Sequence, residues 1–214
     1  AGYPWAWSVV PWMAGRTAAV DPLRADQAPL FGQVLAGIRA AANGTPPDEL
    51  PRNDYRGTPL AQVPDVDERL ERVSASRTVA DRAALTGLWR RALSAPVDTD
   101  DVLLHGDLHP KNLVSDGGRL VAVLDWGDLT LGDPATDLGA MWLHFPAEAH
   151  RQVLAAYGSP APTPATLARA RGWALVFALN LWEAGTAGDA AFATVAAATL
   201  ERLVRGEPDR TRQD

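Results

Sequence analysis

Two glycines at positions 117 and 118 separate a short apolar run, Leu113-Val114, from a longer one, RLVAVL at 119–124. Glycine readily adopts the positive φ angles that a tight turn between antiparallel strands requires. The pattern therefore predicts a β-hairpin over residues 113–124. Another strand signal, Val102-Leu103-Leu104, comes shortly before this hairpin.

Most of the remaining chain has the spacing of amphipathic helices. Apolar residues recur at three- and four-residue steps over 26–42, over 65–93 with an interruption near 74–78, and in three stretches that follow Asp133, Pro164 and Asp189. Asp133 followed by Pro134 is a typical helix start. The fold class predicted is α+β, with helix predominating.

Two further segments have other patterns. Residues 5–12, WAWSVVPW, are aromatic and β-branched, which predicts a strand at a sheet edge, followed by a turn through 14–16. Residues 45–64 contain five prolines and cannot form one regular element. We expect them to cross the surface in an ordered way, anchored by Leu50, Tyr55 and Leu60.

Composition narrows the function classes. A chain of 214 residues, 47% hydrophobic, can bury one substantial core, with room for two subdomains. Having no cysteine, it has neither disulfides nor thiolate chemistry. Its net charge of -6 disfavours nucleic acid as a partner and weakly favours cationic small molecules. No apolar run approaches eighteen residues and the start lacks a basic signal region, so we expect a cytoplasmic protein without membrane contact.

Three polar residues around the hairpin carry the chemistry. The hairpin would bring Asn112 and Asp125 within roughly one rung of each other, at a strand spacing of about 4.8 Å. An amide oxygen and a carboxylate suit Mg²⁺, which keeps waters and phosphate oxygens as its other ligands. Asp107, just upstream, could accept a proton from a hydroxyl group. These are the parts that a protein kinase uses for phosphoryl transfer.

The histidines and acids of the same region also allow other functional interpretations. His105 and His109 flank Asp107 as H-x-D-x-H, which would suit zinc or iron, but no further clustered ligand completes such a shell. We expect His105 in the core and His109 along the loop. Lys111, the only lysine, faces either solvent or phosphate. The acids Asp128 and Glu183 could contact a cationic substrate.

The motifs resemble those of a known family. HGDLHPKNL at 105–113, LDWG at 124–127 and GDPATDL at 132–138 are similar to the C-terminal lobe of the aminoglycoside phosphotransferases, distant relatives of protein kinases. YPWAWSVVPWMAG at 3–15 resembles the family's last N-lobe strand and hinge, and PRNDYRGTPL at 51–60 resembles a segment of its bacterial members. The resemblance covers nearly the whole chain.

The resemblance implies a role for particular residues. Asp107 corresponds to the catalytic aspartate, Asn112 and Asp125 to magnesium ligands, and Asp137 to a buried aspartate that braces the catalytic loop. The backbone of Trp12, Met13 and Ala14 would bind adenine as the hinge. Residues 1–15 would then be the last N-lobe strand and hinge, and residues 16–214 the helical C-terminal lobe. Tryptophan at position 126 departs from the phenylalanine of the kinase motif.

The implied activity is ATP- and Mg²⁺-dependent transfer of the γ-phosphate to a hydroxyl of an aminoglycoside or similar molecule, a reaction that confers antibiotic resistance. Such enzymes also need a strand-borne lysine and a loop over the phosphates. Neither precedes Tyr3, so we expect an N-terminal lobe to be missing and the isolated piece to be weak or inactive. A macrolide, a choline-like alcohol or an amino-acid hydroxyl are alternative acceptors, and a noncatalytic, partner-binding lobe is an alternative function.

Overall fold

The structure is a computed structural model that describes residues 10–75 and 79–206. Its α-helices are α1 (Ala28–Ala40), α2 (Val66–Ser74), α3 (Val79–Ser94), α4 (Ala135–Gly139), α5 (Met141–His144), α6 (Ala147–Tyr157), α7 (Pro164–Thr186) and α8 (Ala190–Arg205). Short 3-10 helices span Ala25–Gln27, Leu60–Gln62 and Trp126–Asp128. The strands are β1 (Arg16–Thr17), β2 (Val102–Leu104), β3 (Leu113–Asp116), β4 (Arg119–Val123) and β5 (Thr130–Gly132). The predicted α+β class is confirmed.

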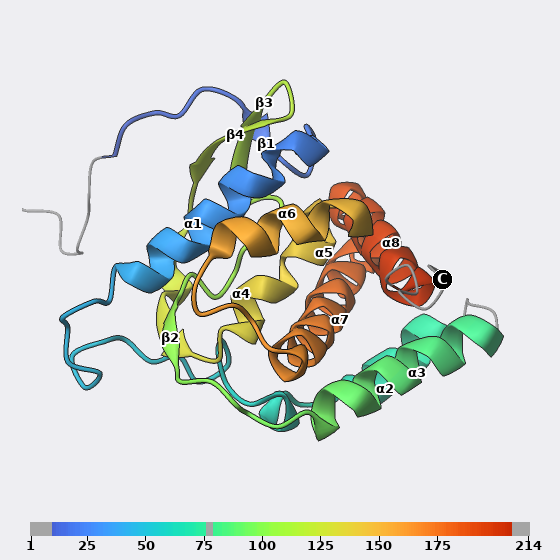
Figure 1. Cartoon of the computed structure of the whole chain (residues 1–214). Coiled ribbons are helices and arrows are strands. Elements are labelled where there is room, and N and C mark those ends of the chain that lie inside the picture. Colours follow the sequence, from blue (N-terminus) through green and yellow to red (C-terminus); the bar gives the residue numbers. More distant parts are fainter. Residues whose placement is uncertain (1–9, 76–78, 207–214) are drawn as a thin grey trace, which may run out of the picture.

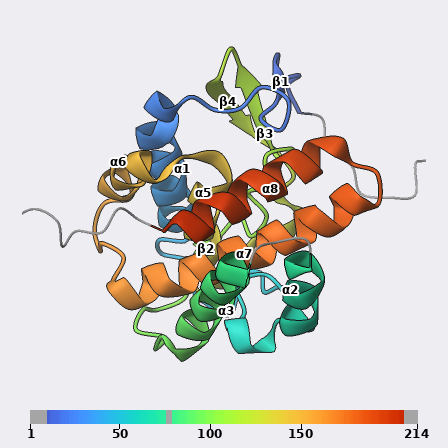
Figure 2. The same cartoon turned by 90° about the vertical axis from the view of Figure 1, so that its right-hand side faces the viewer.

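Helix α7 forms the centre of the helical part. It packs against α8 along much of its length and also contacts α3 and α4, so helices from both halves of the chain meet on it (Figures 1 and 2). Pro164 begins the helix after the cap Thr163, whose hydroxyl accepts the N–H of Thr166. Trp173 is fully buried on it. Helix α7 is therefore a main element of the core.

The strands form two small antiparallel sheets, of which β1-β3-β4 lies at one end of the molecule and β2-β5 lies nearer the helices (Figure 1). The sheet β1-β3-β4 contains the hairpin, in which Leu113 pairs with Val123 and both turn glycines have positive φ. The second sheet pairs β2 with β5, Leu103 lying opposite Leu131. The predicted hairpin is confirmed.

Most helix predictions are confirmed, with boundaries that shift by a few residues. Asp189 caps α8 by accepting the N–H of Phe192. The helix expected after Asp133 is divided into α4 and α5, and Asp133 accepts the N–H of Ala135 at its start. The five-proline segment is ordered, and Leu60 is buried on it.

Two predictions at the N-terminal end need comment. Arg16 was expected in a turn, which is wrong: it belongs to β1 and pairs with Ser115 on the hairpin edge. A two-residue strand leaves no alternating pattern for sequence reasoning to detect. Of the strand expected over 5–12, residues 5–9 lie outside the described residues, and residues 10–12 form no regular element.

Candidate active site

The loop between β2 and β3 holds the central carboxylate. Gly106 turns the chain at φ +84°, and an added Cβ there would lie 2.6 Å from the carbonyl oxygen of Asp128. Asp107 follows directly, and a chain of backbone hydrogen bonds runs from its carbonyl to the N–H of His109, and from the carbonyl of His109 to the N–H of Asn112. This compact turn fixes Asp107 relative to Asn112.

Two buried side chains brace the loop from beneath. Asp137 on α4 accepts the N–H of His105 at 2.7 Å and the N–H of Gly106 at 2.9 Å. Burial raises the pKa of Asp137, and these two donors oppose the rise by favouring the carboxylate. His144 on α5 contacts the carbonyl of Leu108 through Nε2 at 2.8 Å. The loop is thus held to the helical core, as predicted for Asp137.

His105 is fully buried and engaged at both ring nitrogens. Its Nε2 lies 2.9 Å from the carbonyl oxygen of Leu124, and its Nδ1 accepts the N–H of Asp107 at 3.3 Å. The ring also packs against that of Trp126, at 4.8 Å between centroids and a tilt of 55°. His105 therefore joins the Asp107 loop to the end of the hairpin, as a core residue.

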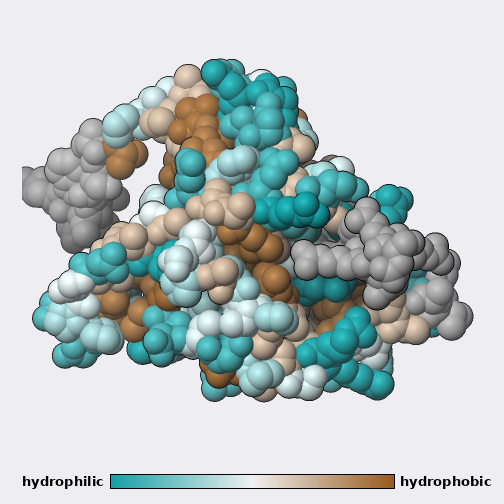
Figure 3. Space-filling view, in the orientation of Figure 1, coloured by the Kyte–Doolittle hydropathy of each residue, from teal (hydrophilic) through white to brown (hydrophobic). Residues whose placement is uncertain are grey.

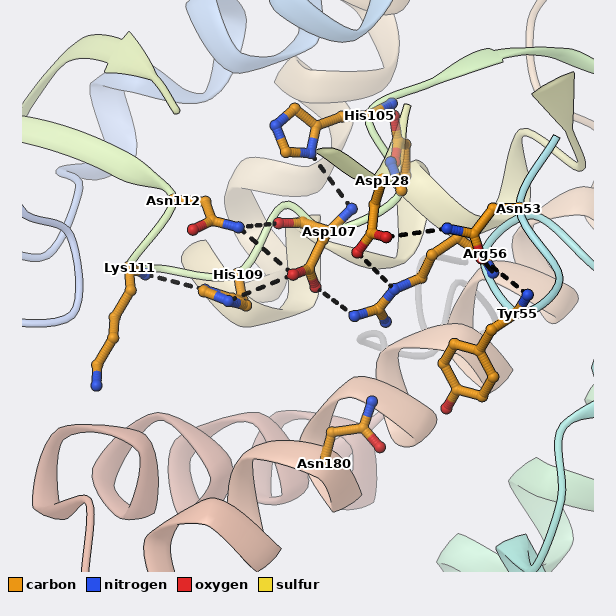
Figure 4. A network of polar contacts seen from close by, with 12 residues as sticks. Asn53, Tyr55, Arg56, His105, Asp107, His109, Lys111, Asn112, Asp128 and Asn180 are labelled. Carbon is orange, nitrogen blue, oxygen red and sulfur yellow. Dashed lines mark hydrogen bonds and ion pairs between the residues drawn. The ribbon is translucent and has the colours of Figure 1, made fainter. Parts of the chain in front are cut away.

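The side chain of Asn112 faces Asp107 through its nitrogen. Nδ2 donates to the backbone carbonyl of Asp107 at 2.9 Å and approaches the carboxylate oxygen Oδ2 at 3.5 Å. The amide oxygen points away from Asp107 (Figure 4). An oxygen in that position is available to a hard cation.

Asp125 lies directly beyond the hairpin ladder. The N–H of Leu124 donates to the carbonyl of Asn112 at 2.8 Å, which places Asp125 one residue past the position opposite Asn112. Asp125 is exposed and adopts φ 58°, a conformation that non-glycine residues adopt rarely and that is concentrated at functional sites. The hairpin thus brings the backbones of the two expected metal ligands together.

An arginine that sequence reasoning missed is paired with Asp107. Arg56, from the five-proline segment, donates through Nη2 to Asp107 Oδ1 at 2.8 Å and through Nε to Asp128 Oδ2 at 3.4 Å (Figure 4). Its side chain is 15% exposed. The one clue in the sequence was the resemblance of residues 51–60 to a family segment.

His109 lies on the other side of the same carboxylate. Its Nε2 is 3.5 Å from Asp107 Oδ2, and its ring packs edge-on against Phe192. Burial lowers the pKa of His109, and the nearby Arg56 lowers it further, although the charge of Asp107 opposes both. His109 is therefore expected to be neutral at pH 7.

Lys111 is paired with Asp189 at the start of α8, with its ammonium 4.0 Å from the Phe192 ring centroid.

Asp128 and Glu183, the two acids expected to contact a cationic substrate, are both paired with arginines of the chain itself. Asp128 contacts Arg56 and accepts Asn53 Nδ2 at 2.9 Å. Glu183 contacts both Arg69 and Arg72. Partial burial would raise the pKa of Glu183, but the hydrogen bonds from these arginines outweigh it and hold the pKa below its ordinary value.

Besides this centre, the structure has an exposed stretch before β1 and two hollows. Trp12 is 93% exposed in the irregular stretch before β1, with Met13 and Ala14 beside it. A groove of about 360 Å³ runs between α1 and β4 and ends at Trp126. Apolar side chains gather over β4 on the molecular surface (Figure 3). A separate cavity of about 980 Å³ lies between the end of α1, β2 and the start of α7, and its lining contains none of the expected site residues.

Among residues 10–75 and 79–206, no three His, Cys, Asp or Glu side chains cluster in a way that could hold a metal ion. Asn112 with Asp125 is an amide–carboxylate pair, which is a different donor set. Over the same residues, no helix is both long and apolar enough to cross a lipid bilayer.

Solved structures with the same fold are kinase-like phosphotransferases. The GDP complex of aminoglycoside 2'-phosphotransferase-IIIa has a TM-score of 0.56 at 19% identity; the alignment covers 91% of this chain and 69% of that one. A thermostable mutant of aminoglycoside phosphotransferase APH(4)-Ia, with AMP-PNP and hygromycin B, gives 0.52 at 21% identity, covering 91% and 70%. The choline kinase LicA from Streptococcus pneumoniae gives 0.52 at 19% identity, covering 85% and 64%. No curated protein matches the sequence.

The family match and the fold give the class, a phosphotransferase with an alcohol group as acceptor, and a carboxylate on a braced loop, an asparagine facing it and an aspartate past the following hairpin accord with it. The model of the phosphotransferase enzyme family matches residues 1–205, so the chain belongs to that family.

Proposed function

We propose that the protein transfers the γ-phosphate of ATP to a hydroxyl group of a small molecule, with Asp107 as the catalytic base. One observation carries the proposal. Asp107 Oδ1 is held by Arg56, while Oδ2 lies between His109 and Asn112 at 3.5 Å from each. That second oxygen is the one left to accept a proton from an acceptor hydroxyl.

The step balances as follows. The acceptor oxygen forms a bond to the γ-phosphorus, the bond from that phosphorus to the β–γ bridging oxygen breaks, and the hydroxyl proton passes to Asp107 Oδ2. ADP leaves with the bridging oxygen, and the acceptor becomes a phosphate monoester. The protein contributes position and charge, which dominate catalysis in phosphoryl transfer.

The donor set around the hairpin fits Mg²⁺. Asn112 and Asp125 would hold the ion with one neutral and one anionic oxygen, the kind of partial shell that leaves room for phosphate oxygens and water. When bound, the ion would neutralise charge on the transferring phosphate. The exposed backbone of Trp12 to Ala14 is our candidate for the adenine contact.

The groove beside Trp126 supports a further expectation about the whole protein. Leu30 and Trp126 line it, and both remain partly exposed at 39% and 47%. Contiguous exposed apolar surface marks a region that contacts a protein, a ligand or a membrane. We propose that a lobe carrying the phosphate-binding lysine packs there, and that residues 10–206 without it are weakly active.

An aminoglycoside or a similar molecule is the first acceptor to test. Phosphorylation of such a molecule in the cytoplasm would make the protein an antibiotic-resistance enzyme. The paired acids favour a second candidate. An aminoglycoside carries several positive charges, yet Asp128 and Glu183 are engaged with arginines. That pattern favours an acceptor with few charges, such as a macrolide, a choline-like alcohol or an amino-acid hydroxyl.

The test is a coupled ADP assay on the full-length protein that contains these residues. Aminoglycosides, macrolides, choline and serine are offered with ATP or GTP and Mg²⁺, and the phosphorylated product is identified by mass. Asp107→Asn should reduce kcat by about 10²–10⁴-fold, the range for loss of a general base. Asp116→Asn, at the exposed hairpin turn, is the matched control and should not change kcat. Binding of a protein partner without phosphorylation of any acceptor would instead support a noncatalytic lobe.

A further inference from the structure

Arg56 has an arrangement that packing does not explain. Its guanidinium bridges two carboxylates, Asp107 at 2.8 Å and Asp128 at 3.4 Å, which lie in different loops of the chain. It also lies over the ring of Phe177 on α7, at 5.5 Å, and over that of Tyr55, at 5.2 Å. One planar group thus connects the five-proline segment, the catalytic loop and α7 (Figure 4).

The remaining nitrogen of this guanidinium has no partner. Arg56 Nη1 is buried and donates no hydrogen bond to any residue that the structure describes. An unsatisfied buried donor costs about 1–3 kcal/mol, which offsets part of what the two ion pairs of Arg56 contribute to stability. The contact of Arg56 with the carboxylate of Asp107 gives the arginine a role beyond packing.

The backbone around Arg56 is built to hold the guanidinium in place. Asn53 Oδ1 accepts the N–H groups of Tyr55 and Arg56, at 2.8 and 2.9 Å, and Asn53 Nδ2 donates to Asp128. Gly57 follows at φ +73° and its carbonyl accepts the N–H of Asp133 at 3.0 Å. Both the arginine and its second carboxylate partner are therefore fixed by one asparagine.

Close approach of the catalytic loop depends on the absence of a side chain. A Cβ at Gly106 would lie 3.1 Å from Arg56 Cβ and 2.6 Å from the backbone oxygen of Asp128. Only glycine lets the loop come near enough for Arg56 to reach the very next residue, Asp107. The contact between Arg56 and Asp107 thus depends both on the turn that Asn53 holds and on Gly106.

We propose that Arg56 is a positioning residue for phosphoryl transfer. By binding Oδ1, it sets the rotamer of the Asp107 carboxylate so that Oδ2 faces the acceptor hydroxyl, which forms the new O–P bond as its proton moves to Oδ2. Because the guanidinium is planar and has several donors, it can bind Asp107 and Asp128 simultaneously, which an ammonium group cannot do with the same geometry. The proposal rests on the proposed function, since it assigns the role through Asp107.

The test compares variants at two arginines of the same segment in the full-length protein. Arg56→Met keeps the length of the side chain and its packing on Phe177 but loses the contact with Asp107. It should lower kcat about 10²-fold, the cost of a misplaced catalytic group, with little change in the KM for nucleotide. Arg52→Met is the matched control, because Arg52 forms an exposed pair with Asp101 at 3.1 Å; it should leave kcat unchanged.

Two further measurements separate positioning from folding. The melting temperature of Arg56→Met should fall by only a few degrees, because Asp107 and Asp128 are 17% and 37% exposed and water can solvate the carboxylates that lose their partner. Guanidinium added to Arg56→Ala should restore part of the lost kcat, whereas Arg52→Ala should not respond. Arg56→Lys should recover less than half of the loss in kcat.

The outcomes are distinct. Wild-type kcat in Arg56→Met, or a kcat that falls only in parallel with the melting temperature, overturns the positioning role and leaves the proposed function intact. A wild-type protein that phosphorylates no acceptor removes the proposed function and this role with it. A rise in the KM for nucleotide with unchanged kcat would place Arg56 in nucleotide binding and would also overturn the proposal.

Discussion

Asp137 accepts the backbone N–H of His105 at 2.7 Å, from a position 32 residues further along the chain. The second oxygen of the same carboxylate accepts the N–H of Gly106. Both donors belong to the turn that presents Asp107, so the orientation of the catalytic loop depends on a side chain of the helical core. Four predictions besides the kinetic tests above follow from this and related contacts.

Asp137→Asn should destabilise the protein and loosen the loop. The amide can accept only one of the two N–H groups, and its own nitrogen would face the other. An unsatisfied buried group of this kind costs about 1–3 kcal/mol of unfolding free energy, which corresponds to a fall in melting temperature of about 2–4 °C per kcal/mol for a chain of this size. Calorimetry measures this. Asp116 forms an exposed pair with Arg119, so Asp116→Asn should have the melting temperature of the wild type. If Asp137→Asn had that same melting temperature, Asp137 would not brace the loop.

Magnesium dependence should change when either expected ligand is altered. Asn112→Ala and Asp125→Asn each remove one oxygen donor or its charge, so the Mg²⁺ concentration for half-maximal turnover should rise at least about tenfold. A magnesium titration of initial rates, with nucleotide in excess, reads this out. Asp116→Asn again provides the control from the same hairpin. An unchanged magnesium midpoint in both ligand variants would place the ion elsewhere.

His144 should make the fold sensitive to acid. Burial lowers the pKa of His144 from 6.5 to about 4, and Arg202 and His109 contribute in the same direction. Above pH 6.5 the ring is neutral in both folded and unfolded chains and contributes nothing. Between pH 6.5 and 4 only the unfolded chain takes up the proton, so stability falls as the pH falls, by up to about 1.4 kcal/mol per pH unit.

The comparison variant for this effect is His144→Gln, which can still donate to the carbonyl of Leu108 but does not titrate. Urea unfolding at several pH values should give a shallower loss of stability for His144→Gln than for the wild type between pH 6.5 and 4. The slopes are compared, because the substitution also changes packing beside Phe31. Parallel slopes would show that His144 does not remain neutral in the folded chain.

Gly132→Ala should disturb the site from a distance. A Cβ at Gly132 would lie 2.6 Å from the Cα and the carbonyl oxygen of Gly57, the residue after Arg56. We expect the segment to shift, with a stability loss of about 1–3 kcal/mol from overpacking and a lower kcat. Gly37→Ala is the opposite case, since nothing lies within 4 Å of its added Cβ and it is in α1. That variant should gain about 0.5–1 kcal/mol in unfolding free energy. Unimpaired kcat in Gly132→Ala would show that the Arg56 contact tolerates movement of its segment.

Much of the fold could be predicted because its signals are local. The hairpin follows from two glycines between apolar runs, and the long helices follow from apolar spacing and from caps such as Asp189. The arrangement of Asn112 opposite the end of β4 follows from the same hairpin. Where the determining residues lie within one element, the sequence alone was sufficient.

The contacts that were missed join distant parts of the chain. Arg56 and Asp107 are 51 residues apart, and nothing local to either indicates that they meet. β1 is a strand only because Arg16 and Thr17 find a partner in β3, and Lys111 faces Asp189 because α8 happens to begin there. Such pairs depend on packing of whole elements, which periodicity does not describe.

The two-residue strand β1 has a mechanical consequence. It attaches the segment before residue 16 to the free edge of the hairpin, with Gly15 so close that a Cβ there would lie 2.5 Å from the carbonyl oxygen of Ser115. A displacement of residues 10–14 would therefore reach β3 first, whose neighbour in sequence is Asn112. A movement at this end of the molecule would change the tilt of the hairpin before it changed the positions of the helices.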